Sequence, residues 1–169
     1  MSPANAPRTI VIESLARLLD DAFEGDPDQS LFANLRDVRD DDWLAVPPGG
    51  TRTVADILEH VGWAKWMYEE YAFGSALLRG DVPPMVTDDG RPRPRQELIA
   101  WVREGHRRLV TSVLALADDG ELERPRRTNW GKLLPTRTLI QILIGHDFYH
   151  AGEINHIRAT LQGMDTWPY

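Results

Sequence analysis

Two histidines four residues apart, His146 and His150, are the residues whose type and spacing point most clearly to chemistry. In a helix, this spacing places two side chains on one face, about 40° apart in rotation and one turn apart in height. Both lie in an apolar stretch from Leu139 to Leu161, on a stripe with the spacing of a buried seam. We therefore expect both imidazoles at core-facing positions, and a bound metal is the leading reason for placing them there.

A third histidine, His60, falls on a similar stripe of an earlier predicted helix, together with Ile57, Ala64, Met67 and Tyr71. Neutral imidazole is the commonest side-chain metal ligand, and three protein ligands with one open position are typical of a catalytic zinc site. Imidazole also suits nickel, iron and copper, so the ligand type does not choose the metal. The spacing is equally compatible with hydrogen-bonded core histidines or with a surface coincidence.

The composition excludes several other kinds of site. The chain has 169 residues and no cysteine, which rules out disulfides, thiolate metal sites and cysteine nucleophiles. Its net charge of −7 disfavours binding to nucleic acid, which depends on neutralising phosphates. No apolar run approaches the roughly 18–20 residues of a membrane span, and the first residues lack the pattern of a signal peptide. We expect a cytoplasmic protein that acts on a small molecule, not on nucleic acid or a membrane.

Apolar periodicity predicts four main helices and a short one near Leu31–Leu35, and we find no strand alternation. The four run from about Thr9 to Phe23, from the capping residue Thr53 to Phe73, from Gln96 to Ala117, and from Thr136 or Thr138 to Gly163. The expected fold is all-α, an antiparallel four-helix bundle with a long crossover between helices 1 and 2. It forms a single domain over residues 1–169, with a flexible N-terminus (1–8) and a C-terminal tail (164–169).

The remaining polar residues of these helices are expected to lie mostly outside the site. On the second helix, Glu59, Lys65, Glu69 and Glu70 mark the face expected in solvent. His156 lies about 240° round the last helix from His150, so it should face elsewhere. His106 is expected at a wet margin. Trp63 and Tyr149 can line the site or simply pack, and Met67 and Tyr71 are expected mainly in the core.

A resemblance to a known family adds weight to the metal hypothesis. The last helix contains His146-x3-His150-Ala-Gly-Glu153-Ile-x3-Arg158-x2-Leu-x-Gly. This segment resembles the H-x3-H-R-G-Q-I-x3-R-x2-L-G helix of the DinB/YfiT-like superfamily. The segment around His60 and its Pro-Gly-Gly-Thr-Arg-Thr-Val approach are also similar, and the order of helices and loops agrees over nearly the whole chain.

The resemblance implies a four-helix bundle that holds a divalent metal, zinc or nickel, through His60, His146 and His150. Some relatives use a low-molecular-weight thiol such as mycothiol or bacillithiol in transfer or isomerisation, others are metal-dependent hydrolases, and dimers are common. A thiol-dependent S-transferase working as a homodimer is therefore the leading expectation. A metal-dependent hydrolase and a non-catalytic, metal-binding stress-response bundle are the alternatives.

The chain departs from the family pattern at two positions in the last helix. Ala151 stands where the family has Arg, and Glu153 stands where it has Gln. Glu153 lies three residues after His150, so its carboxylate can approach the site. It is a candidate catalytic base or an orienting partner for an imidazole, although a polar residue at a bundle or dimer surface is the simpler interpretation.

Overall fold

The computed structural model describes residues 9–74 and 93–163, so the predicted flexible N-terminus and C-terminal tail lie outside the described residues. This part of the chain is mainly helical. Its helices are α1 (Ile10–Asp20), α2 (Leu31–Arg36), α3 (Val54–Phe73), α4 (Arg95–Leu114), α5 (Gly120–Glu123) and α6 (Thr136–Gln162). A π-helical turn, η1 (Asp21–Gly25), continues α1, and a 3-10 turn, η2 (Asp40–Asp42), follows α2.

The ends of α3 and α6 are set by local chemistry that the sequence predicts. The hydroxyl of Thr53 accepts a hydrogen bond from the backbone N–H of Asp56, and the Asp56 carboxylate accepts one from the N–H of Thr53. This reciprocal capping box satisfies N–H groups that have no partner within the helix. At the other end of the chain, Gly163 adopts the left-handed conformation (φ 64°) that terminates α6.

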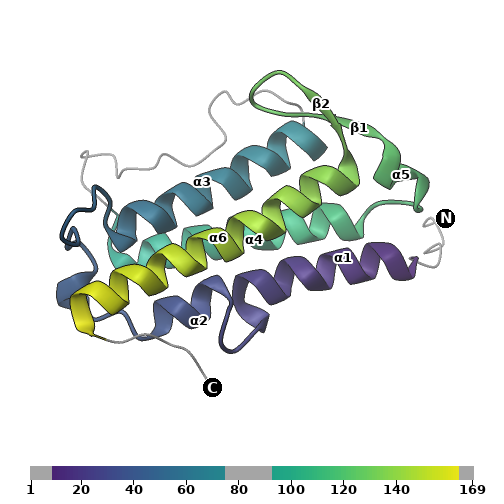
Figure 1. Ribbon diagram of the computed structural model, residues 1–169. Coiled ribbons are helices and arrows are strands. Elements are labelled where there is room, and N and C mark those ends of the chain that lie inside the picture. Colours follow the sequence, from purple (N-terminus) through teal and green to yellow (C-terminus); the bar gives the residue numbers. More distant parts are fainter. Residues whose placement is uncertain (1–8, 75–92, 164–169) are drawn as a thin grey trace.

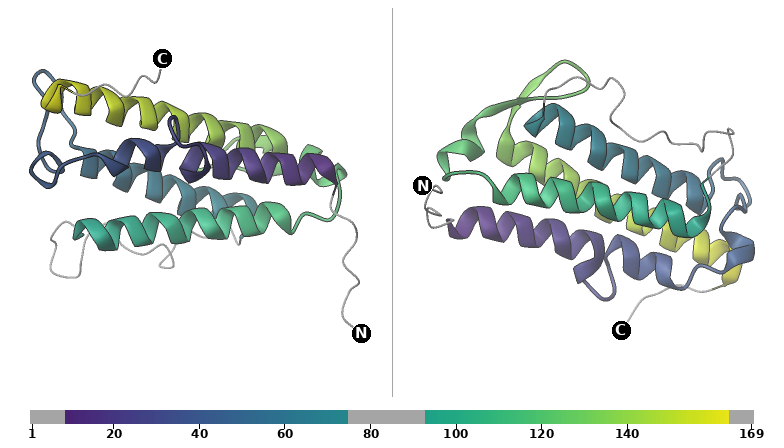
Figure 2. Two further views of the ribbon diagram at one scale, coloured as in Figure 1. Left: turned by 90° about the horizontal axis from the view of Figure 1, so that it is seen from below. Right: turned by 180° about the vertical axis from the view of Figure 1, so that it is seen from behind.

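The four long helices α1, α3, α4 and α6 lie side by side, with α2 extending the course of α1 (Figures 1 and 2). α1 and α4 are antiparallel, since Asp20 contacts His106 while Glu24 contacts Arg103. α3 and α4 run parallel: Gly62 faces Trp101, and Glu69 accepts a hydrogen bond from Ser112.

This order differs from the predicted one. We expected antiparallel helices with the long crossover between the first and second. The parallel course of α3 and α4 puts the end of α3 and the start of α4 at opposite ends of the body (Figure 1). The connection after α1 needs no crossover, because α1 runs antiparallel to α4 and therefore also to α3. Its buried Leu31 and Leu35 form α2, which packs against α6.

A small hairpin is the second departure from the sequence prediction. Strands β1 (Pro125–Arg127) and β2 (Leu133–Pro135) pair antiparallel, with Arg126 opposite Leu134, where we expected only a loop. Three residues are too few to show the alternation by which strands are recognised. The hairpin leads into α6, where Thr136 donates its backbone N–H and its hydroxyl to the carbonyl of Arg124.

Close packing of α3 against α4 depends on two glycines that each face a tryptophan. A Cβ atom on Gly62 would stand 2.4 Å from Trp101, and one on Gly105 would stand 2.7 Å from Trp66. The Trp66 indole N–H donates to the carbonyl of Trp101 at 3.1 Å. None of the helices in the described ranges is long and apolar enough to cross a membrane.

We predict that Gly62→Ala lowers the free energy of unfolding by about 1–3 kcal/mol, because the added methyl group collides with a packed tryptophan ring. Gly145→Ala is the matched control. Nothing lies within 4 Å of a Cβ at that helical position, so the substitution should be neutral or stabilise by up to about 1 kcal/mol. Urea denaturation measures both. Equal effects of the two substitutions would contradict the close approach of α3 to α4.

Candidate metal centre

Three histidine side chains from two helices converge at the seam between α3 and α6. The Nε2 atom of His146 lies 3.1 Å from Nε2 of His60 and 3.2 Å from Nε2 of His150. Together, His60, His146 and His150 form a group whose potential ligand atoms all lie within 4.8 Å of one another. The structure thus brings together the three histidines that the sequence and the resemblance singled out.

The two nitrogen–nitrogen distances from His146 fit a tetrahedral cation. Zinc–imidazole bonds of about 2.0–2.1 Å at tetrahedral angles place ligand nitrogens roughly 3.3 Å apart. Hydrogen bonding alone does not account for the cluster, because a neutral ring has one N–H and His146 faces two other Nε2 atoms. The three histidines can therefore hold a metal ion, and their nitrogen donors suit zinc or nickel equally.

The site opens toward solvent on the α3 side. His150 is buried and His146 is half-buried, but His60 is exposed. The sequence predicted all three at core-facing positions, and for His60 this is wrong. The buried face of α3 is formed by neighbours of His60 such as Ile57 and Val61, so the histidine sits at the edge of the core rather than in it.

Electrostatics keep the three imidazoles neutral, which is the form that binds metal. Burial is the main cause that lowers the pKa of all three rings. For His146, burial together with the neighbouring histidines and Lys65 lowers the pKa to about 3. The Arg52 cation also lowers the pKa of His60 and His150, whereas the Glu153 carboxylate opposes the shift in both.

Glu153 orients His150 from behind. Its Oε2 lies 2.8 Å from Nδ1 of His150, and its Oε1 accepts a hydrogen bond from Nη2 of Arg52. A proton on Nδ1 leaves the Nε2 lone pair directed at the cluster, as in the carboxylate–histidine pairs of metal sites. Both carboxylate oxygens of Glu153 are engaged, one by His150 and one by Arg52. The contact between Arg52 and Glu153 could not be predicted from the sequence, because the two residues lie 101 positions apart.

A buried ion pair lies beside the cluster. The Lys65 ammonium donates to Oδ2 of Asp147 at 2.6 Å, and each side chain is 1% exposed. Burial raises the pKa of Asp147, and the Lys65 cation opposes that shift. We expected Lys65 and Glu69 on the solvent side of α3, and the structure contradicts this because both are buried. Their partners on α6 and α4 could not be identified from helix periodicity alone.

The other candidate residues lie outside the cluster. The ring of Tyr149 stands edge-on to His150 at 5.0 Å, with most of its side chain exposed. His106 is buried, not at a wet margin, and stacks on Phe23 at 3.8 Å, so it is not a member of the histidine cluster. His156 is exposed, and Met67 lies in the core as expected.

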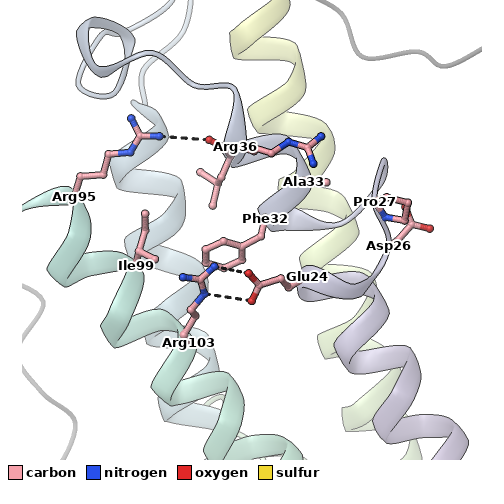
Figure 3. A pocket seen from close by; sticks show the side chains of 10 residues that line it. Glu24, Asp26, Pro27, Phe32, Ala33, Arg36, Arg95, Ile99 and Arg103 are labelled. Carbon is pink, nitrogen blue, oxygen red and sulfur yellow. Dashed lines mark hydrogen bonds and ion pairs between the residues drawn. The ribbon is translucent and has the colours of Figure 1, made fainter.

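A cavity of about 370 Å³ lies between η1, α2 and α4, apart from the histidines (Figure 3). Arg103 crosses it to pair with Glu24, and its guanidinium lies 4.5 Å from the centre of the Phe32 ring. The arginines that line it are paired with carboxylates, Arg95 with Asp40 among them. Its charges are thus already balanced, and the convergence of ligand nitrogens makes the histidine cluster the better candidate site.

Comparison with known proteins agrees with the geometry. The family model for the DinB superfamily matches residues 22–154, a range that includes all three histidines and Glu153. No curated protein matches the chain.

We predict that the metal-free protein loses stability as the pH falls below about 6.5. The folded pKa of His146 is about 3, below the unfolded value, so the unfolded chain binds more protons between these limits. Such a histidine costs up to about 2 kcal/mol between pH 7 and pH 5. His146→Gln should remove that share of the loss in urea denaturation, whereas His156→Gln at an exposed position should not. An unchanged pH dependence in His146→Gln would refute the assignment.

A second prediction concerns the buried pair. Lys65→Met leaves the Asp147 carboxylate buried without a cation and should cost about 3–5 kcal/mol in unfolding free energy. The double variant Lys65→Met/Asp147→Leu should recover most of that loss, since no lone charge remains. Arg17→Met removes a partner from an exposed pair with Asp21 and should change stability little. A double variant as unstable as Lys65→Met alone would contradict this account.

Proposed function

The chain belongs to the DinB superfamily, which is metal-binding, and on that premise we propose that it is a divalent-metal-dependent S-transferase. In this proposal, His60, His146 and His150 hold zinc or nickel, and the co-substrate is a low-molecular-weight thiol of the mycothiol or bacillithiol kind. The sulfur of the intact thiol forms a bond to an electrophilic small molecule.

The observation that carries the proposal is the convergence of three Nε2 atoms at a seam that opens on one side. Three protein ligands leave a position for an exogenous ligand, as catalytic sites do, and the exposure of His60 supports access from solvent. When bound, a divalent cation supplies Lewis acidity that lowers the pKa of a thiol or a water molecule beside it.

The contacts of the Glu153 carboxylate favour thiol chemistry over hydrolysis. Activation of water for hydrolysis commonly uses a free carboxylate as general base, as in helix-borne zinc protease sites. Here Glu153 is the carboxylate on the cluster, and its oxygens are committed to His150 and Arg52. A thiol ionises near pH 8.5 even without help, so a modest fall in its pKa gives a thiolate without a general base.

In the proposed reaction, the bond that forms to sulfur is matched by one that breaks in the substrate. The thiol gives its proton to solvent, and its sulfur donates an electron pair to the electrophilic carbon of the substrate. The carbon–sulfur bond forms as the bond to the leaving group breaks, and the leaving group departs with that electron pair. The three imidazoles stay neutral throughout, while Glu153 keeps His150 in the tautomer that presents Nε2.

We predict that purified protein binds one divalent metal ion per chain, measured by elemental analysis after dialysis. His60→Ala and His150→Ala should each weaken binding at least 100-fold, because each removes one of three ligands. His156→Ala is the matched control on α6 and should bind as the wild type does. A wild-type chain that binds no metal would overturn the proposed function.

With metal present, the loaded protein is tested for conjugation of thiols to electrophiles and, in parallel, for ester hydrolysis. Thiol conjugation that disappears in His60→Ala is the expected result. Hydrolysis without conjugation would replace the transferase by the hydrolase, and neither activity would favour a non-catalytic metal-binding bundle.

A further inference from the structure

We propose that a second cleft of the molecule binds a small organic amine, whose ammonium group pairs with the carboxylate of Asp20. The cleft has a volume of about 620 Å³ and is lined by the end of α1, the turn η1 and the helix α4. The histidine centre is built on α3 and α6 instead, so the two sites share no residue. The inference goes beyond the proposed function and does not depend on it.

Asp20 is the carboxylate of this cleft that lacks a cationic partner. The other two carboxylates of the wall are each paired with an arginine, Glu24 with Arg103 and Glu104 with Arg107. Among the described residues, the hydrogen bond of Asp20 is the one between its Oδ1 and Nε2 of His106, at 2.8 Å. The side chains of the wall therefore carry one uncompensated negative charge, which favours a cationic ligand.

His106 holds the Asp20 carboxylate without neutralising it. The His106 side chain is 8% exposed, and burial together with the Lys65 cation lowers its pKa to about 2, so the ring is neutral. Its Nδ1 is buried without a partner among the described residues, so the one ring proton belongs on Nε2, where Asp20 accepts it. Stacking on Phe23 at 3.8 Å fixes the ring. Asp20 thus has one oxygen held and one left for a ligand.

Lys65 does not supply the missing cation. Its ammonium lies 4.8 Å from the centre of the Phe23 ring, but it donates to Asp147 at 2.6 Å, and its side chain is 1% exposed. Burial and the neighbouring Asp21 raise the pKa of Asp20, and Lys65 opposes that shift only as the smallest of the three causes. An ammonium group beside Asp20 would favour its charged form directly.

The rest of the wall suits an apolar body attached to the ammonium. Ala100 and Val110 line the cleft from α4, while Phe23 and Gly25 line it from the π-helical turn η1. Single π-helical turns are rare and are frequent at functional sites. The volume also lies within the range of about 300–1,000 Å³ that is typical of pockets for small molecules. A primary or secondary amine with a hydrocarbon or aromatic body matches this combination of charge, lining and size.

The competing interpretation is that Asp20 only supports the buried His106. In that case, Asp20→Asn would change the stability of the protein but not its choice between a charged and a neutral ligand. The ratio of affinities for two ligands of the same body separates these roles, because a purely structural effect moves both affinities together.

The test is an NMR titration of the isotope-labelled protein with phenethylamine and with its neutral analogue phenethyl alcohol. The wild type should bind the amine about tenfold or more tightly than the alcohol, with saturable shifts at amides of the cleft such as Gly25 and Val110. Asp20→Asn should reduce that preference to about twofold or less, since the charge is gone. Ala100→Trp, at an exposed position of the wall, should weaken both probes because the indole fills the cleft.

Asp41→Asn is the control for general electrostatics, since it removes an exposed carboxylate of η2 outside the cleft, and it should preserve the wild-type ratio. Equal affinities for the two probes in the wild type, or an unchanged ratio in Asp20→Asn, would overturn the inference. Shifts that do not saturate, or that centre on the three histidines instead of the cleft, would overturn it as well. A chain that binds no metal would overturn the proposed function and leave this inference intact.

Discussion

The ion pair between Lys65 and Asp147 fixes how α3 and α6 lie against each other, and the histidine centre depends on that register. Lys65 is five residues from His60 on α3, and Asp147 is adjacent to His146 on α6. Apolar contacts tolerate a small slide of one helix along another, but a buried pair at 2.6 Å does not, because sliding leaves two unpaired charges in the interior. The register is thus set within two turns of the place where ligand nitrogens must meet to a few tenths of an ångström.

Next to the seam, a neutral imidazole, a carboxylate and a guanidinium contact one another in sequence. The imidazoles are kept neutral by burial, the carboxylate of Glu153 stands behind His150, and the cation of Arg52 stands beyond Glu153. A glutamine at position 153, as in the family pattern, would carry no charge and could not form the ion pair with Arg52. The carboxylate at position 153 therefore engages two residues, His150 and Arg52.

Sequence reasoning predicted the helices, the capping box and the identity of the three histidines, because periodicity, capping and ligand chemistry are local properties. It failed where a partner on another helix decides the outcome. The pattern of α3 predicts that Lys65 and Glu69 face solvent. In the structure both are buried: Lys65 donates a hydrogen bond to Asp147, and Glu69 accepts one from Ser112. The parallel course of α3 and α4 was also missed, since glycine–tryptophan contacts such as Gly62 with Trp101 leave no periodic trace. The contact of Arg52 with Glu153 joins a loop to a helix and has no sequence pattern.

The spacing of the three histidines along the chain has a consequence for how the protein folds. His146 and His150 become neighbours as soon as one turn of α6 forms, whereas His60 lies 86 residues from His146 and arrives only when α3 docks. An ion captured first by the local pair would gain its third ligand on docking, so coordination would favour closure of that long loop. The ligand spacing thus separates a local pair within α6 from a third histidine that reaches it only when the α3–α6 seam has formed.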